Sequence, residues 1–204
     1  MKKIFLILMV LLLLTGCSYS PKEVLLTKEE AINYAKDKFG KVTFKNIKSK
    51  TDDQIVYTFV DKKYGFEYEV ISSASKFCLD GSCSDFYFNS TTSTFVKKYY
   101  DYIVASLDDE ISKIENQYNV TVKNNDGWDS ILQKYNFEEC YSQTAFFSVY
   151  DNDEGTMYEA ATQLAKSVKK IDNRKFFEKC SIWTRNNERN SNGVYPRIDS
   201  VLLK

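Results

Sequence analysis

The chain has 204 residues with five cysteines and no histidine, which limits the chemistry that it can perform. Without histidine it has no Ser-His-Asp triad, no Cys-His nucleophile pair and no H-E-x-x-H zinc site. A four-cysteine zinc site needs two close cysteine pairs, and only Cys78 and Cys83 are close in sequence. An enzyme built on this chain would use carboxylate, lysine or tyrosine chemistry, and we expect no bound cofactor or metal.

Two acidic clusters, Asp108-Asp109-Glu110 and Glu138-Glu139, are the candidates for acid–base catalysis. Paired carboxylates can cleave a glycosidic bond. Acidic clusters on helix surfaces and loops are more often solvated, however, and nothing in the sequence predicts a raised pKa or a cleft here.

The stretch Asp151-Asn152-Asp153-Glu154-Gly155 superficially resembles a calcium-binding loop. An EF-hand needs glycine at its sixth position and a bidentate acid at its twelfth, whereas Gly155 is fifth and Thr162 is twelfth. A turn in front of a capped helix therefore explains the stretch better than a metal site.

The first residues have the composition of an export signal. Lys2 and Lys3 precede an apolar run of ten residues, 5–14, which is too short for a helix that crosses a bilayer. The next residues, Leu14-Thr15-Gly16-Cys17, resemble the lipobox of bacterial lipoproteins, in which the signal peptide is removed just before a cysteine that carries lipid on its sulfur.

This resemblance implies that residues 1–16 are a signal peptide and that the lipidated Cys17 begins the mature chain. The lipid would hold the protein in the cell membrane, on its extracytoplasmic face. The alternatives are an ordinary signal peptide with an incidental cysteine, and an uncleaved anchor.

Four cysteines remain once Cys17 is assigned to lipid: Cys78, Cys83, Cys140 and Cys180. An even number in an exported chain predicts two disulfides, with three possible pairings. Leu79-Asp80-Gly81-Ser82 predicts a four-residue hairpin turn that brings Cys78 and Cys83 together. We predict the pairs 78–83 and 140–180. The C-x₄-C spacing argues against a redox pair, which is typically C-x-x-C.

Charge and composition narrow the class of protein. Removal of Lys2 and Lys3 with the signal peptide leaves 26 basic and 28 acidic side chains. Binding to nucleic acid requires a clustered basic face, and this charge balance does not predict one. With 43% hydrophobic and 15% aromatic residues, the mature chain can form one larger domain or two small ones.

The pattern of apolar residues predicts an α+β fold. We expect a lipidated tether at 17–26 and an extracytoplasmic domain at 27–204, with two lobes, 27–92 and 93–204, as the alternative. A capping box formed by Thr27 and Glu30 begins a helix that ends at Gly40. From 42 to 88 the period is two, which predicts an antiparallel meander. The polar residues 89–94 are expected to connect it to the next helix.

The second half is expected to contain helices and a smaller strand-helix-strand-strand unit. A helical pattern covers 95–118, and Ser106 with Asp109 could cap a second helix within it, so a break there is possible. A short strand at 119–122 and a helix around Trp128 follow. Strands are predicted at 140–150, 176–184 and 194–203, and a capping box of Thr156 and Glu159 is expected to begin the helix after the first of them. Residues 140–184 could form a crossover unit.

The 15 tyrosines suit either a binding surface or a core, and we favour the core for most of them. The stretches DKKYGFEYEV at 61–70, DGS at 80–82 and FVKKYYDYI at 95–103 resemble small uncharacterised lipoproteins of low-GC Gram-positive bacteria. The resemblance covers about residues 28–103, and its motifs are not catalytic. It implies a class of protein and no mechanism.

The sequence therefore predicts a membrane-anchored extracytoplasmic binding or interaction module. Its partner would be a protein, a peptide or a cell-wall polymer. The alternatives are a histidine-free cell-wall glycan hydrolase that uses Asp or Glu, and an inhibitor or assembly lipoprotein that covers a site on a neighbouring protein.

Overall fold

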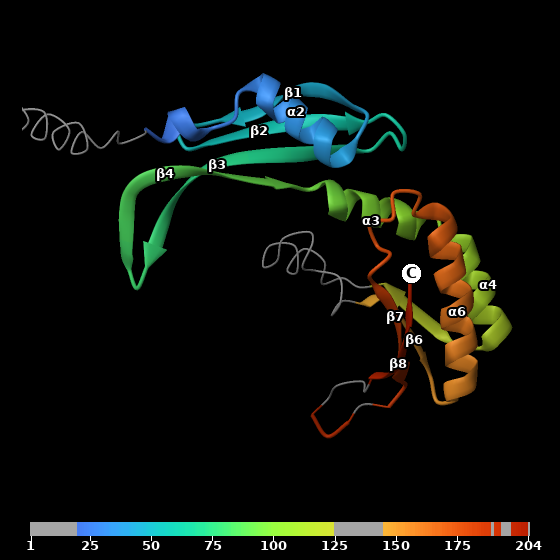
Figure 1. The fold of residues 1–204 in the computed structure, drawn as a ribbon. Helices are drawn as coiled ribbons and strands as arrows, with labels where there is room; N and C mark the ends of the chain where they lie inside the picture. Colours follow the sequence, from blue (N-terminus) through green and yellow to red (C-terminus); the bar gives the residue numbers. More distant parts are fainter. Residues whose placement is uncertain (1–19, 125–144, 189, 193–196, 204) are drawn as a thin grey trace, which may run out of the picture. The chain divides into compact units, whose positions relative to one another are not determined.

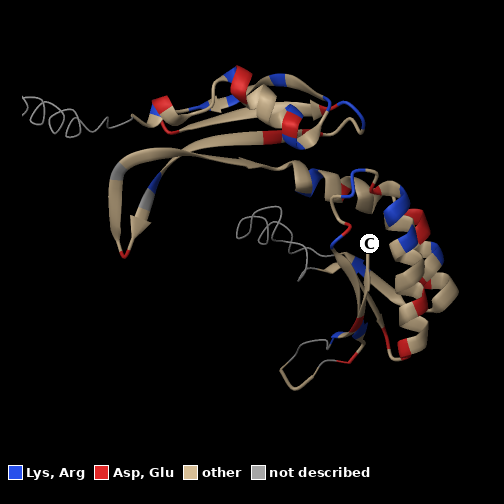
Figure 2. Cartoon of the chain, viewed as in Figure 1, with Lys and Arg blue, Asp and Glu red and all other residues tan. Residues whose placement is uncertain are grey.

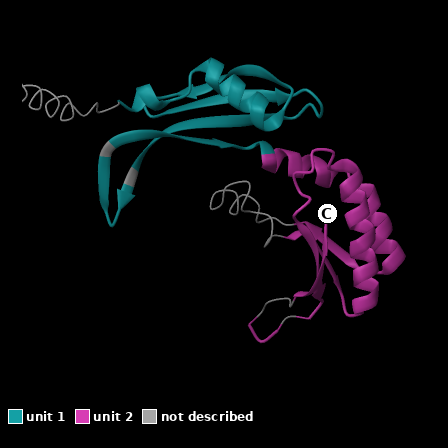
Figure 3. Ribbon diagram, viewed as in Figure 1, with its two compact units in different colours: residues 1–95 teal, residues 96–204 magenta. Residues whose placement is uncertain are grey.

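The computed structural model describes residues 20–124, 145–188, 190–192 and 197–203, apart from the side chains of Phe77 and Asp85. The chain forms two compact units, residues 1–95 and 96–204 (Figure 3). Each unit combines helices with a four-stranded sheet, which confirms the predicted α+β class. Within the described residues, no helix is both long enough and apolar enough to span a membrane.

Unit 1 consists of a helical layer on an antiparallel meander (Figure 1). Its elements are η1 (Pro21–Val24), α2 (Lys28–Phe39), β1 (Val42–Lys50), β2 (Gln54–Asp61), β3 (Glu67–Leu79) and β4 (Ser82–Ser93). The strand order is β1-β2-β3-β4, and each neighbouring pair is antiparallel. The predicted N-terminal helix followed by a meander is confirmed.

Helix α2 begins and ends as the sequence predicts. The Glu30 N–H donates to the Thr27 hydroxyl at 3.3 Å, and the Glu30 carboxylate accepts from the Thr27 N–H at 2.7 Å. At the other end Gly40 has a φ of 82°, a conformation that favours glycine. The helix buries Ala31, Ala35 and Phe39.

Aromatic rings form the core beneath this helix. Phe39 of α2 stacks on Phe95 at 4.3 Å between ring centres, and Tyr68 of β3 meets Phe95 edge-on at 4.9 Å. Phe59 of β2 packs on Tyr68 at 5.8 Å. All four residues are buried. The alternation of apolar and acidic residues around Tyr68 therefore predicts correctly which side of β3 is buried.

Unit 2 is built around a mixed sheet. Its elements are α3 (Phe95–Ala105, of which Phe95 belongs to unit 1), α4 (Asp108–Tyr118), β5 (Thr121–Asn124), β6 (Ala145–Asp151), α6 (Glu154–Ile171), β7 (Ser181–Asn186) and β8 (Arg197–Leu202). The strand order is β5-β6-β7-β8, with β6 and β7 parallel and the other pairs antiparallel. Strands β6 and β7 are joined through α6, which confirms the predicted crossover unit.

The helices of unit 2 pack on one another and on the sheet. Helix α6 contacts α4 and strands β6, β7 and β8, and Figure 1 shows α4 and α6 side by side. In α6 the acidic residues lie toward the N-terminal end and the lysines toward the C-terminal end (Figure 2). Met157, Ala160, Ala161, Leu164, Ala165 and Val168 are the buried residues of α6.

Tyrosines on α3 belong to the core of unit 2. The Tyr99 hydroxyl donates to Asp172 Oδ1 at 3.0 Å, and the Tyr100 hydroxyl donates to the Phe146 carbonyl at 3.1 Å. Both tyrosines are buried, whereas Tyr158 on α6 is 49% exposed. Their burial agrees with the interpretation that most tyrosines serve the core.

Several predicted boundaries are wrong, each for a local reason. Strand β4 continues to Ser93, so residues 89–93 belong to the sheet and not to a connection. Helix α6 begins at Glu154, because Asp153 and not Thr156 is its N-cap. Strand β7 begins at Ser181 and not at 176, because the buried Asp172 accepts the backbone N–H groups of Phe176 and Phe177 and holds that segment in turns.

The predicted break after α3 is confirmed, but the expected cap is absent. The residue before α4 is Leu107, which makes no side-chain capping bond, and the Ser106 hydroxyl donates to the Tyr102 carbonyl at 2.7 Å. The predicted helix around Trp128 and the first part of the strand at 140–150 lie outside the described residues.

Candidate functional site

The β3–β4 hairpin extends beyond the rest of the unit 1 sheet (Figure 1). The pairing of β2 with β3 stops at Gln54 and Ser73, whereas β3 and β4 stay paired as far as Leu79 and Ser82. We call residues 74–89 the arm. It is a two-stranded ribbon, an arrangement that is at best marginally stable in isolation.

The end of the arm is a tight turn. Asp80 and Gly81 both have positive φ, 49° and 83°, and Leu79 and Ser82 on either side are still paired. An Asp-Gly pair is strongly favoured in such two-residue loops, because their twist matches that of the flanking strands. The sequence predicted a four-residue turn, so the strands reach closer to the tip than expected.

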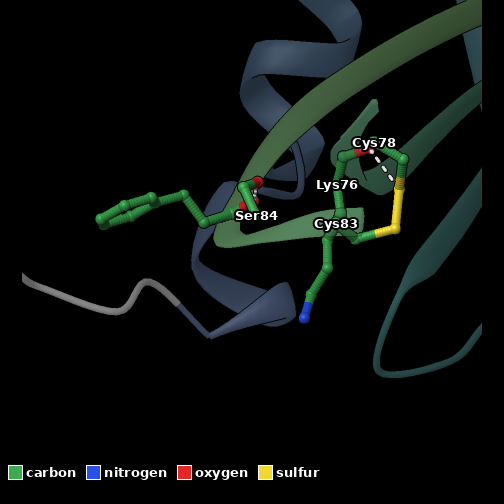
Figure 4. The surroundings of a disulfide bond; sticks show 5 residues. Lys76, Cys78, Cys83 and Ser84 are labelled. Carbon is green, nitrogen blue, oxygen red and sulfur yellow. Dashed lines mark hydrogen bonds between the residues drawn. A yellow bond between two sulfur atoms is a disulfide. The ribbon is translucent and has the colours of Figure 1, made fainter. Parts of the chain in front are cut away.

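A disulfide joins the two strands just before this turn. Cys78 and Cys83 lie directly opposite each other and are bonded, which confirms the first predicted pair (Figure 4). Closing so small a ring is expected to contribute about 2 kcal/mol to the stability of the arm. Cys180 is buried, and Cys17 and Cys140 lie outside the described residues, so the 140–180 pair stays a prediction.

A bulge in β4 interrupts its pairing with β3. Lys76 pairs with Tyr87 and Cys78 with Cys83, so three residues of β4, 84–86, lie opposite one residue of β3. The Ser84 hydroxyl donates to the Phe86 carbonyl at 3.1 Å within the bulge. Bulges commonly re-aim side chains at binding sites.

The arm carries three large apolar side chains that face solvent. Leu79 is 65% exposed, Phe86 56% and Phe88 48%. Figure 2 shows little charge along the arm, where Lys76 and Asp80 are the charged residues whose side chains the structure describes. We call Leu79, Phe86 and Phe88 the arm cluster. An isolated exposed leucine needs no explanation, but three large apolar residues on one narrow ribbon indicate a contact surface.

The N-terminal segment is fastened at the base of the arm. Asn89 Nδ2 donates to the Val24 carbonyl at 2.8 Å and to the Ser72 hydroxyl at 2.7 Å, and the Leu26 N–H donates to the same hydroxyl at 2.9 Å. The Tyr57 hydroxyl donates to the Leu26 carbonyl. Residues 21–26, which the sequence assigns to the tether, are thus attached to the sheet.

The acidic residues singled out by sequence have local structural roles where they are described. Asp108 and Asp109 are exposed in the first turn of α4, where the helix dipole favours negative charge. Glu110 accepts a hydrogen bond from the Ser167 hydroxyl at 3.2 Å. Glu138 and Glu139 lie outside the described residues.

The calcium-like stretch contains the cap of α6. Asp153 Oδ1 accepts from the Thr156 N–H at 2.7 Å, and hydrogen bonding to Thr156 holds the pKa of Asp153 below its ordinary value. The expected turn in front of a helix is confirmed, with the cap three residues earlier than predicted.

Comparison with known proteins gives no assignment. No family model, curated protein or solved structure matches this chain. Any function is therefore inferred from the residues of the chain itself, and the arm is the candidate site.

Sequence reasoning found the disulfide and missed the arm cluster. It interpreted Phe86 and Phe88 as ordinary strand residues, because aromatic residues are typical of strands. A signal was nevertheless present: the facing strand reads Ser72-Ser73-Ala74-Ser75, and residues so small give aromatic side chains little to pack against. Ser75 is the direct partner of Phe88.

Proposed function

We propose that this chain is a membrane-anchored extracytoplasmic lipoprotein that binds another protein through its arm. The single observation that carries the proposal is the exposure of Leu79, Phe86 and Phe88 on a ribbon closed by a disulfide. The lipobox-like residues 14–17 support the cellular location.

The arm cluster is large enough to contribute to binding. Full burial of a leucine or phenylalanine side chain is worth roughly 1.5–3 kcal/mol, and part of that remains available for each member of the cluster. Association and side-chain ordering use up a share of this gain. The disulfide reduces the ordering cost because the ribbon is fixed before the partner arrives.

Lipid on Cys17 would bring such a contact near the membrane, because residues 21–26 are attached to the sheet. Pro21 is four residues after Cys17, a reach of at most about 14 Å for an extended chain. If Cys17 carries lipid, the base of the arm at Asn89 is held close to the membrane surface. A partner that is itself membrane-bound or surface-bound would meet the arm there, and an inhibitory or assembly role would use the same surface.

Site-specific photocrosslinking in intact cells tests this proposal. A photoreactive residue at Leu79 or Phe88 of the full chain is expected to give one discrete protein adduct, which Phe86→Ser should abolish. A photoreactive residue at Tyr158, an exposed aromatic position on α6, is the matched control and is expected to give no such adduct.

Two outcomes would contradict the proposal. Equal adducts from Leu79 and Tyr158 would show that the arm has no special role. Adducts between the arm positions and phospholipid alone would show that the arm contacts the membrane and not a protein.

A further inference from the structure

Strand β4 is an edge strand of the unit 1 sheet, so one of its two sides has no neighbouring strand among the described residues. In an antiparallel pair, residues whose backbone groups bond the partner strand alternate with residues whose backbone groups point away from it. The Thr94 N–H donates to the Glu69 carbonyl at 3.0 Å, and the register continues from there without a shift as far as Tyr87. The residues that turn their N–H and C=O groups away from β3 are therefore Tyr87, Asn89, Thr91 and Ser93.

These outward backbone groups are available to another chain. Within the part of the protein that the structure describes, no hydrogen bond reaches them, and none of the residues 87–93 is buried. Asn89 fastens the N-terminal segment through its side chain and leaves its backbone groups unused. A row of unpaired N–H and C=O groups on an edge strand is a template for pairing with a further strand.

The two edges of this sheet differ in how they are protected. Strand β1 carries Lys45, Lys48 and Lys50, and two register shifts interrupt its pairing with β2. Lysines and bulges are devices by which natural proteins keep an edge from pairing with another chain. Residues 87–93 of β4 contain no charged residue, no proline and no register shift. The sheet is thus protected at β1 and suited to pairing at β4.

The alternation of β4 restricts how this strand can pair with a copy of itself. In an antiparallel pair of two copies, outward residues have to face outward residues, because these exchange the backbone hydrogen bonds. A pair centred on Phe88 meets this condition, since Tyr87 of one copy then faces Asn89 of the other. Phe88 faces Phe88 of the second copy as a pair without backbone bonds, in which side chains approach most closely.

This arrangement covers the exposed rings of the arm cluster. Phe86 would lie diagonally across from Phe88 of the second copy, a separation that aromatic side chains can span. Phe86 is 56% exposed and Phe88 48% exposed, so their burial would stabilise the pair. Residues 86–90, which face one another in this register, carry no charge, and two copies meet there without repulsion. This part of β4 is therefore complementary to itself.

We propose that a second copy of this chain pairs with β4, antiparallel and centred on Phe88, so that the two unit 1 sheets become continuous. The proposal rests on the proposed function, because it names the protein that the arm meets. In such strand addition the backbone hydrogen bonds supply affinity, and the side chains at alternate positions supply specificity.

Sedimentation of the full chain in density-matched detergent measures the dimer. Phe88→Lys and Phe88→Glu should each weaken it by about tenfold or more, since both copies lose a ring and like charges face each other. A mixture of these two variants should form a one-to-one heterodimer, because opposite charges then meet. Tyr158→Lys adds the same charge at an exposed aromatic position of α6 and is the matched control, which should leave the dimer unchanged.

A proline variant tests the backbone contribution separately. The Tyr87 N–H points away from β3, so Tyr87→Pro should keep the hydrogen bonds between β3 and β4. It removes one edge donor from each copy and should weaken the dimer by about tenfold. Tyr87→Thr keeps the N–H and should leave the dimer unchanged. Circular dichroism should be the same for both variants.

Three results would overturn the proposal. They are a chain that sediments as a monomer at every concentration, a dimer that survives both Phe88→Lys and Tyr87→Pro in folded protein, and a mixture of charge variants that forms no heterodimer.

Photocrosslinking from the arm separates failure of this proposal from failure of the proposed function. An adduct with the mass of two copies would support both. An adduct with a different protein alone would support the proposed function and overturn the pairing of two copies. No protein adduct from the arm would overturn both.

Discussion

The two sheets of this protein arrange charge in opposite ways. In unit 1 the Lys45 ammonium contacts Glu67 Oε1 at 2.5 Å and the Lys48 ammonium contacts Glu69 Oε1 at 2.5 Å, so cations of β1 meet anions of β3. In unit 2 two cations, Arg185 and Arg197, are placed directly opposite each other.

The ion pairs of unit 1 have a structural consequence. Strand β2 lies between β1 and β3, and both pairs must reach across it. The aliphatic parts of lysine can cover apolar surface while the ammonium stays in water. Val56 and Thr58 of β2 are only 7% and 8% exposed. Opposite charges thus meet across β2 in unit 1, whereas in unit 2 the guanidinium groups of Arg185 and Arg197 both lie near the Trp183 ring.

The largest expected effect comes from the core of unit 1. Phe59→Ala should destabilise that unit by about 3–5 kcal/mol, because a buried ring in the aromatic cluster is replaced by a cavity. Both tryptophans, Trp128 and Trp183, belong to unit 2. Tryptophan fluorescence should therefore keep its unfolding midpoint while circular dichroism shows an earlier transition. Equal shifts in both signals would mean that the two units unfold together.

Removal of the disulfide should have a smaller and local effect. Cys78→Ser combined with Cys83→Ser should destabilise the arm by about 2 kcal/mol, because the unfolded ribbon is no longer closed into a ring. Amide hydrogen exchange should speed up in residues 74–89 and remain unchanged in β2. A uniform increase over unit 1 would contradict the account of the arm as a separately stabilised ribbon.

A charge reversal should weaken the sheet of unit 1. Glu67→Lys places a like charge beside Lys45 and should destabilise this unit. The change should be below about 1 kcal/mol, since the pair is exposed. Chemical denaturation measures it, and an unchanged free energy of unfolding would show that the pair does not stabilise the sheet.

Acid should weaken the caps of one helix in each unit. Hydrogen bonds from the Thr27 backbone and hydroxyl lower the pKa of Glu30, and hydrogen bonds from Thr156 lower that of Asp153. A carboxyl with a lowered pKa stabilises the fold above its unfolded pKa, and this stabilisation is lost as pH falls through the folded value. The effect should therefore appear below about pH 4.

Matched amide variants check this small pH effect. Glu30→Gln and Asp153→Asn keep hydrogen-bonding oxygens but cannot titrate, so each should flatten the pH dependence of unfolding between pH 5 and pH 2. An unchanged slope in both variants would show that other carboxyl groups cause the acid sensitivity.

Local signals in the sequence predicted a good part of unit 1. The capping box at Thr27, the glycine at the end of α2 and the Asp-Gly pair between two cysteines all act over a few residues, so they can be read without knowledge of the fold. The position at which β4 ends could not be predicted from such local signals. Residues 89–93 are polar and typical of a loop, yet Asn89 and Thr91 pair with β3 and belong to the sheet.

The candidate site and other long-range contacts depend on information that the sequence does not carry locally. Trp183 and Arg197 are brought together by the register of β7 and β8, which depends on the whole sheet. Phe86 and Phe88 were predicted only as strand residues, and their exposure follows from the extension of their strand beyond the rest of the sheet. Asp153 shows the same limit on a smaller scale, since the capping pattern beginning at Thr156 was equally plausible by spacing.

Lipidation of Cys17 is the most direct test of the proposed function, because without it the arm would not be held at a membrane. Protein extracted from membranes with detergent can be digested and its N-terminal peptide weighed by mass spectrometry. We predict a peptide that begins at Cys17 and carries a diacylglyceryl group, with residues 1–16 absent. A peptide that retains residues 1–16, or one that contains an unmodified Cys17, would contradict the proposal.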